Sequence, residues 1–322
     1  MKILDELRDC ETIAISGHVR PDGDCVGSCM AMALYLRDNL PDARVDVFLE
    51  DFSEELEKNI AGTDTVNHDY VTDVEHYDAF LCLDCENTRL GDAMGFYAAA
   101  KKTINIDHHK TNPGCGMVNF VVPTASSTCE LVYQVMDDEK LTKDIAKNLY
   151  IGMVTDTGVF MFSNTSRQTM AIAGRLMEFG FDYPTIVREV FHEKSYVQQQ
   201  ILGRALLESI LFLDGKCIFS RIDRKTMQFY QATSSDLDGI SSQLSNTKGC
   251  LCAIFMYEVK PLTYKVSLRS TTDDVDVARI AEKFGGGGHI RAAGCTVNAP
   301  YHDIINNMSE LIEQQLTDHG IL

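Results

Sequence analysis

An apolar run, Thr103-Ile104-Asn105-Ile106, leads directly into three ionisable residues, Asp107-His108-His109. The apolar run is typical of a strand, whereas three consecutive ionisable side chains are poor core material. Side chains alternate between the two faces of a strand, so at most two of the three can reach one site directly. The pattern therefore predicts a strand that ends in a polar site. The alternative is a solvated loop.

Three earlier runs have the same strand-like form: 12–16, 44–49 and 79–83. Helix-length segments separate the four runs, which predicts an α/β fold with a parallel sheet and helices on both faces. We expect further helices at 26–40, 142–155, 166–179 and 183–210. Ligands of such sheets bind at the carboxyl ends of the strands, so polar residues there are the first candidates for a site.

A different pattern begins near Gly215. Strand-like runs at 216–222, 250–257, 264–268 and 293–297 accompany helical patterns at 275–284 and 301–318. A chain of 322 residues commonly forms two domains. We therefore expect a parallel-sheet domain at 1–190, a helical connector at 191–210 and a smaller α/β domain at 211–322.

Acidic residues and histidines follow four of the elements in the first domain. The first group lies in a turn, Gly17-His18-Val19-Arg20-Pro21-Asp22-Gly23-Asp24. The others are Asp84 after the third strand, Asp107 and His108 after the fourth, and Asp156 before Gly158. Each acid has a structural alternative as a helix cap or a turn former. Together they predict a pocket for two divalent ions with a shared bridge, which suits displacement at phosphorus.

A glycine run, Gly285-Gly286-Gly287-Gly288, precedes His289 and Arg291, and Arg269 ends an earlier strand. Exposed backbone N–H groups beside these basic side chains suit a phosphate or a carboxylate, although the run also fits a flexible linker. The segment is not a P-loop, because no Gly-Lys-Ser/Thr sequence follows it.

The net charge is −18, and residues 1–100 hold 22 Asp and Glu against 7 Lys and Arg. Such a field repels long polyanions, so the chain is not a general binder of long nucleic acids. No apolar run is long enough for a membrane helix, and the acidic N-terminus does not resemble a signal peptide. Eleven irregularly spaced cysteines favour reduced thiols in a cytoplasmic protein.

The ordered set of His18, Asp22, Asp24, Asp84, Asp107-His108-His109 and Asp156 resembles the DHH phosphoesterase superfamily. Arg269 with the run from Gly285 to Gly294 resembles its DHHA1 substrate domain. The resemblance covers nearly the whole chain and is greatest for the branch of bifunctional oligoribonucleases (nanoRNases) and pAp phosphatases. Family II pyrophosphatases, RecJ-like exonucleases and membrane-bound cyclic-dinucleotide phosphodiesterases fit less well in domain content.

The resemblance implies a role for each matching residue. His18, Asp22 and Asp84 would hold one Mn²⁺, and Asp24, Asp84, His108 and Asp156 a second, with Mg²⁺ or another divalent cation as an alternative. His109 would face the scissile phosphate and Asp107 would support the site. The substrate-binding residues would be Arg269, Gly287, Gly288 and His289, with a less defined role for Arg291.

These roles predict hydrolysis of short oligonucleotides and of 3'-phosphoadenosine 5'-phosphate (pAp) by water activated between two ions. Two alternatives stay open: a phosphodiesterase for linear dinucleotides such as pApA or a pyrophosphatase or polyphosphatase, and a nucleotide-binding regulator without turnover. The expected partners are short single-stranded RNA or DNA and nucleotides, with no membrane. A homodimer is left open.

Overall fold

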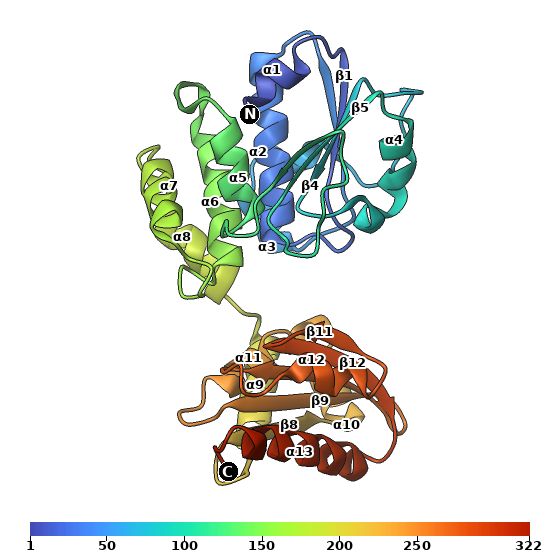
Figure 1. The fold of residues 1–322 in the computed structure, drawn as a ribbon, viewed down its shortest axis with the longest axis vertical. Coiled ribbons are helices and arrows are strands. Elements are labelled where there is room, and N and C mark those ends of the chain that lie inside the picture. Colours follow the sequence, from blue (N-terminus) through green and yellow to red (C-terminus); the bar gives the residue numbers. More distant parts are fainter. The chain divides into compact units, whose positions relative to one another are not determined.

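A computed structural model describes the whole chain, Met1 to Leu322. It divides into two compact units, Met1–Glu193 and Lys194–Leu322 (Figure 1). Each unit has its own sheet and its own hydrophobic core. No helix in either unit has the length and apolar character needed to cross a bilayer.

A six-stranded sheet organises the first unit. Its strands are β1 (Thr12–Ser16), β2 (Arg44–Phe48), β3 (Val66–Asn67), β4 (Ala79–Leu83), β5 (Lys102–Asp107) and β6 (Val118–Val121). They lie in the order β3-β2-β1-β4-β5-β6, and every neighbouring pair is parallel. The predicted parallel sheet is therefore confirmed. The short strands β3 and β6 are additions to the four predicted strands.

Helices cover both faces of this sheet, as predicted (Figure 1). They are α1 (Ile3–Leu7), α2 (Gly23–Asn39), α3 (Glu54–Asn59), α4 (Met94–Ala99), α5 (Thr128–Val135), α6 (Lys143–Asp156), α7 (Arg167–Met177) and α8 (Tyr183–Val187). Alternate strand residues point to opposite faces. Ile13 and Ile15 join the larger core, which holds α2, α5 and α6, whereas Ala14 joins the smaller core beside α4.

The strand order creates one topological switch point. From β1 the chain builds outward through β2 and β3, and then returns to place β4 on the other side of β1. The carboxyl ends of β1 and β4 therefore lie side by side, paired along Ile13–Ser16 and Ala79–Cys82. Ligands of open parallel sheets bind at such a point, because the connections leave the two strand ends in opposite directions.

The second unit contains a mixed six-stranded sheet. Its strands are β7 (Ile210–Phe212), β8 (Cys217–Ile222), β9 (Cys252–Lys260), β10 (Thr263–Ser270), β11 (Gly287–His289) and β12 (Ala292–Asn298), in the order β11-β12-β10-β9-β8-β7. Only β8 and β9 pair in parallel. The helices are α9 (Tyr196–Leu207), α10 (Arg224–Tyr230), α11 (Ile240–Ser245), α12 (Val277–Glu282) and α13 (Tyr301–Asp318). One core joins the sheet to α12 and α13, and another joins it to α9 and α11.

Two segments differ from the local expectation. The helical pattern at 183–210 is interrupted after His192, and Ser195 caps a new helix, α9, through hydrogen bonds exchanged with Gln198. Buried Ile201 and Ala205 attach α9 to the core of the second unit. The glycine run does not form a free loop, since its residues 287–289 form β11 and pair with β12.

Candidate metal centre

His18 and Asp84 face each other across the switch point. His18 follows β1 and Asp84 follows β4, and His18 Nε2 lies 3.4 Å from Asp84 Oδ2. The Nδ1 of His18 lies 3.0 Å from the Val19 carbonyl, which can only accept, so Nδ1 is the donor and Nε2 points at the carboxylate. Asp84 has a left-handed backbone (φ 61°), a conformation uncommon for residues other than glycine.

Asp22 forms the helix cap considered for it and also lies close to His18. Its Oδ1 accepts hydrogen bonds from the backbone N–H groups of Asp24 and Cys25, each at 3.1 Å, and so caps α2. The same oxygen lies 3.8 Å from His18 Nε2. Because of this cap, α2 begins at Gly23, three residues before the predicted start.

A second group of ligand atoms surrounds His108. Its Nε2 lies 3.4 Å from Asp156 Oδ2, 3.6 Å from Asp84 Oδ1 and 3.9 Å from Asp24 Oδ2. Asp84 therefore presents one oxygen to His18 and the other to His108. A carboxylate whose two oxygens face two different histidines could be shared by two cations.

The first turn of α5 holds two of these carboxylates in place. The N–H groups of Thr128 and Cys129 donate to the two oxygens of Asp24 at 2.6 and 2.9 Å, and Thr128 Oγ1 donates to Asp84 Oδ1 at 2.9 Å. Within its own segment, Ser127 only caps α5, because its hydroxyl accepts from the Glu130 N–H. Thr128 meets Asp24 and Asp84 across 104 and 44 positions of sequence, contacts for which the local sequence carries no signal.

A hydrogen-bond chain supports His109 from behind. Its Nδ1 lies 2.7 Å from Asp107 Oδ1, and Asn112 Nδ2 donates to Asp107 Oδ2 at 2.6 Å and to Asn105 Oδ1 at 2.9 Å. Burial alone would raise the pKa of Asp107, but the bonds from His109 and Asn112 outweigh it and lower that pKa. Asp107 thus stays ionised and holds the His109 ring with its Nε2 free.

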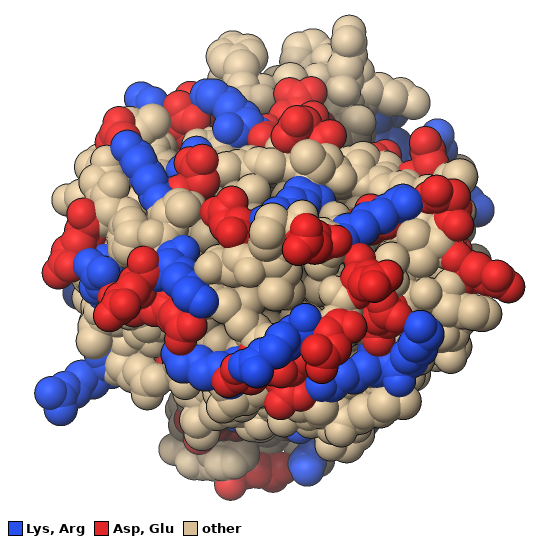
Figure 2. Space-filling view, turned by 90° about the horizontal axis from the view of Figure 1, so that it is seen from above, with Lys and Arg blue, Asp and Glu red and all other residues tan.

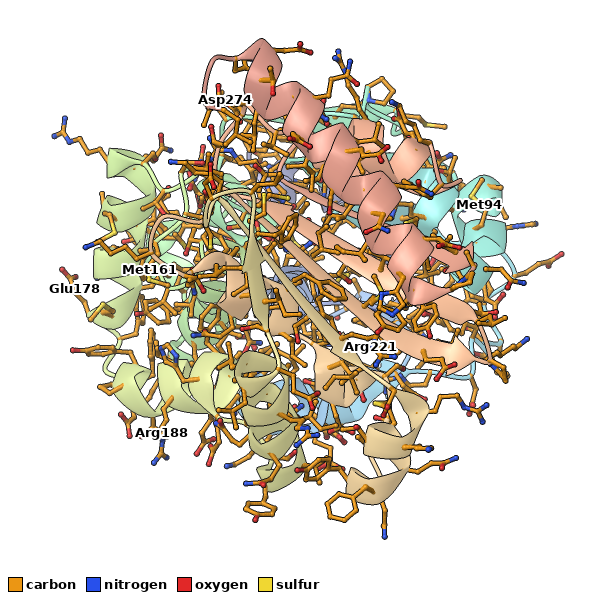
Figure 3. The ribbon with its side chains drawn as sticks, turned by 90° about the horizontal axis from the view of Figure 1, so that it is seen from below. Met94, Met161, Glu178, Arg188, Arg221 and Asp274 are labelled. Carbon is orange, nitrogen blue, oxygen red and sulfur yellow. The ribbon has the colours of Figure 1, made fainter.

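Asp156 is the last residue of α6 and adjoins the turn that follows the helix. Asn164 Nδ2 ties this turn to the loop before α5 by donating to the carbonyls of Asp156 and Ser126, at 3.1 and 2.9 Å. Positive φ angles at Gly158, Val159 and Phe160 reverse the chain here. The reversal leaves Met161 at the outside of the molecule (Figure 3).

The electrostatics of the cluster are those of a cation site. Burial, together with Asp24 and Asp22, raises the pKa of Asp156 to about 8, and burial raises the pKa of Asp24 and of Asp84. Burial opposes the charged form of His18, but hydrogen bonds to Asp22 and Asp84 raise its pKa to about 11. Four carboxylates and two imidazoles in one pocket are a donor set that fits divalent cations.

Comparison with known proteins identifies both units. A model of the N-terminal domain of the DHH family matches residues 12–153, and a model of the DHHA1 domain matches residues 214–318. The chain belongs to the DHH phosphoesterase family. We call Met1–Glu193 its DHH domain and Lys194–Leu322 its DHHA1 domain. As a family member the chain is a divalent-metal-dependent hydrolase.

Relatives align over almost the full chain. The protein named bifunctional oligoribonuclease and PAP phosphatase NrnA from Bacillus subtilis is 26% identical over 295 residues, covering 89% of this chain and 90% of that protein. The protein of the same name from Thermus thermophilus is 28% identical over 326 residues, covering 96% and 92%. The structure of an exopolyphosphatase-related protein from Bacteroides fragilis shares the fold, with a TM-score of 0.87 at 24% identity, covering 97% and 94% of the two chains.

The predicted substrate-binding residues of the DHHA1 domain lie on two strands, β10 and β11, with β12 between them. Arg269 on β10 pairs with Ala292 of β12, which in turn pairs with His289 of β11. Burial lowers the pKa of Arg269, and its guanidinium donates to Ser242 Oγ at 3.4 Å and to the Leu268 carbonyl at 3.1 Å. Gly287, Gly288 and His289 are exposed on the edge strand.

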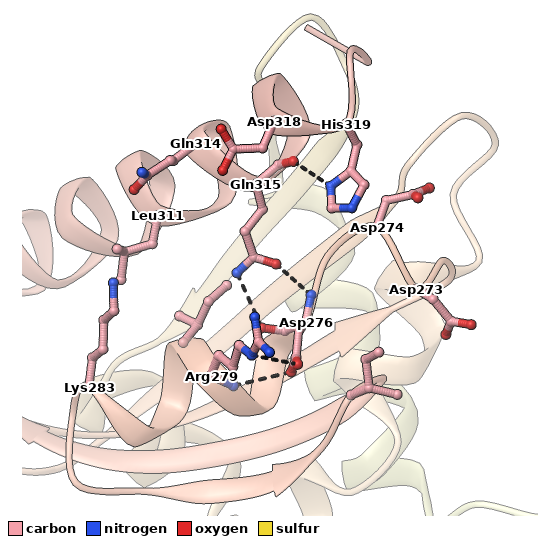
Figure 4. A pocket seen from close by; sticks show the side chains of 12 residues that line it. Asp273, Asp274, Asp276, Arg279, Lys283, Leu311, Gln314, Gln315, Asp318 and His319 are labelled. Carbon is pink, nitrogen blue, oxygen red and sulfur yellow. Dashed lines mark hydrogen bonds and ion pairs between the residues drawn. The ribbon is translucent and has the colours of Figure 1, made fainter.

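Arg291 is engaged elsewhere, since its Nε lies 2.8 Å from Asp273 Oδ1. Close to this ion pair, a cavity of about 410 Å³ opens between α12, α13 and the segment at 273–276 (Figure 4). Asp276 N–H donates to Gln315 Oε1 at 2.6 Å across it. None of the four predicted residues 269 and 287–289 lines this cavity.

Figure 2 shows no continuous basic stripe on the face that it presents, where Lys and Arg alternate with Asp and Glu. In the DHHA1 domain, Arg221 of β8 (Figure 3) is used in packing, with its guanidinium 4.0 Å from the centre of the Tyr301 ring.

Proposed function

We propose that the protein is a Mn²⁺-dependent phosphoesterase that hydrolyses short oligonucleotides and pAp. The observation that carries the proposal is the position of Asp84, whose two oxygens face His18 and His108 at 3.4 and 3.6 Å. A carboxylate shared in this way suits a pair of cations at the edge of the sheet, and a pair of cations suits displacement at phosphorus.

The two ions would be held by different sets of residues. We assign His18, Asp22 and Asp84 to the first ion, and Asp24, Asp84, His108 and Asp156 to the second. When bound, the ions supply activation of water and neutralise charge on the phosphoryl oxygens. Oxygen-rich donors of this kind suit Mn²⁺ and Mg²⁺.

His109 would act on the substrate directly. Asp107 and Asn112 fix its ring through Nδ1, which leaves Nε2 free for an oxygen of the scissile phosphate, to which the doubly protonated ring can donate. The ring is partly exposed, whereas Asp107 is fully buried. This arrangement suits His109 as the donor that stabilises developing negative charge, and Asp107 as the carboxylate that only orients the His109 ring.

The substrate class rests on the relatives and on charge. Relatives aligned over most of the chain are named oligoribonucleases and PAP phosphatases. An acidic DHH domain disfavours long strands but tolerates a few phosphates that are neutralised in the pocket. We assign nucleotide binding to Arg269, Gly287, Gly288 and His289 of the DHHA1 domain. The exposed N–H groups of an edge strand and a guanidinium suit a terminal phosphate.

One substrate panel tests this proposal. The purified protein is incubated with Mn²⁺ and pAp, di- to pentanucleotides, pApA, long single-stranded RNA, a cyclic dinucleotide, pyrophosphate or polyphosphate, and the products are resolved over time. We expect turnover of pAp and of the short oligonucleotides, and its loss after chelation. Preferred turnover of pyrophosphate or polyphosphate would overturn the substrate assignment. Tight nucleotide binding without any product would indicate a regulator instead.

A further inference from the structure

The thiol of Cys25 lies close to His18 and Asp84. The ligand atoms of His18, Cys25 and Asp84 all lie within 4.8 Å of one another, and all three residues are buried. They come from three different elements: the end of β1, the first turn of α2 and the end of β4. Cys25 is fully shielded from solvent.

The backbone makes room for the sulfur at this place. A Cβ on Gly17 would lie only 2.2 Å from Cys25 Sγ, so any larger residue at 17 would displace the thiol. The cap formed by Asp22 fixes the start of α2 and with it the direction of Cys25. Cys29, one turn further along α2, is equally buried but does not belong to the group.

Asp22 is less firmly held beside His18 and Asp84 than Cys25 is. Its Oδ1 already accepts two backbone hydrogen bonds, and its side chain is 62% exposed. The buried donors nearest to His18 are therefore a carboxylate and a thiol. Around His108, by contrast, the donors are the oxygens of Asp24, Asp84 and Asp156.

This difference in donor atoms has a chemical consequence. Sulfur ligands favour softer cations such as Co²⁺, Zn²⁺ and Cd²⁺, whereas carboxylates suit Mn²⁺ and Mg²⁺. We propose that Cys25 is a sulfur ligand of the first metal position and makes that position selective for a softer divalent cation than the second. The proposal rests on the metal centre described under Proposed function and adds a ligand and a selectivity to it.

Cobalt absorption tests the proposal without any turnover. Metal-free protein is titrated with Co²⁺, and the thiolate-to-cobalt charge-transfer band in the near ultraviolet is recorded for the wild type and for the variants Cys25→Ala, Cys25→Ser and Cys29→Ala. Circular dichroism confirms that each variant is folded. We expect a band from one cobalt per chain in the wild type and in Cys29→Ala, and no band in the two Cys25 variants.

Affinities give a second measurement. We expect the Cys25 variants to lose at least about tenfold in Cd²⁺ affinity at one site, because losing a ligand costs no less than losing an outer-shell partner. Their Mn²⁺ affinity should change by less than about threefold. A band that persists in Cys25→Ala, or no band in the wild type, would overturn the proposal. If the band depends on Cys25 but no substrate is hydrolysed with Mn²⁺, the proposed function fails and the sulfur ligand stands. If Mn²⁺-dependent turnover is observed without the band, the proposed function stands and the sulfur ligand fails.

Discussion

Replacing Asp84 by Asn should separate the effect of this carboxylate on the stability of the metal-free protein from its effect on turnover. The change keeps the size of the side chain and leaves one oxygen to accept from Thr128 Oγ1. Asn also tolerates the left-handed backbone of residue 84, where Ala would add strain. The variant therefore removes a charge and a shared ligand with little other disturbance.

The substitution should raise the stability of the metal-free protein and lower turnover. Burial raises the pKa of Asp84 in the metal-free protein, so the neutral amide should raise its stability. The largest gain at pH 7 is about 4 kcal/mol, the cost of protonating a carboxyl of ordinary pKa about 3.9. Each kcal/mol shifts the melting temperature of such a unit by about 2–4 °C. Turnover should fall at least about a thousandfold, because a bound ion supplies several kcal/mol to catalysis and about 1.4 kcal/mol is tenfold.

Three measurements check this prediction. Melting temperatures are compared in EDTA and in MnCl₂, metal content is determined after gel filtration, and hydrolysis of pAp and of a dinucleotide is followed. The matched control is Asp78→Asn, which changes an acid just before the same strand, β4. A hydrogen bond to Lys101 lowers the pKa of Asp78 to about 2, so its loss should destabilise the protein without affecting metal content or turnover. The bridge assigned to Asp84 is wrong if its Asn variant keeps both ions and hydrolyses pAp within about tenfold of the wild type.

Three further changes have defined outcomes. Without metal, the raised pKa values of His18 and Asp156 mean that the folded state binds more protons than the unfolded state, so stability should fall as the pH rises from about 6 to 8. Mn²⁺ should therefore raise the melting temperature more at pH 8 than at pH 6, and an equal effect at both would contradict this. Asn112→Ala removes the hydrogen bond that Asn112 donates to Asp107, and should lower kcat about 10–100-fold with normal metal content. An unchanged kcat would show that this hydrogen bond does not contribute to catalysis. Arg269→Ala should impair nucleotide hydrolysis strongly and that of bis(p-nitrophenyl) phosphate less, whereas equal losses would argue against nucleotide binding by the DHHA1 domain.

The long elements were predictable because their patterns are local. A strand buried on both faces is a nearly continuous apolar run, and the runs at 12–16 and 79–83 coincide with β1 and β4. The two-residue strand β3 has no such run. The glycine run looked like a loop because glycine lacks a side chain that favours a strand, but its pairing with β12 made it the edge strand β11.

The supporting residues of the site could not be predicted in the same way. Thr128 meets Asp24 across 104 positions of sequence, and Cys25 lies beside His18 and Asp84 at the ends of two strands. Asn112 reaches back five positions to Asp107. Nothing in the local sequence distinguishes these three from ordinary cap, turn and core residues. Their roles arise from the folded structure, which brings these groups together at the carboxyl ends of the strands.

By itself the sequence determined which side chains follow each strand, and so that acids and imidazoles would stand at one edge of a parallel sheet. Only the tertiary structure decided that β4 returns to lie beside β1, and that Asp84 thereby divides its two oxygens between His18 and His108. The physical reason is that the order of strands is set by the packing of helices and connections on both faces of the sheet, which no run of neighbouring residues encodes.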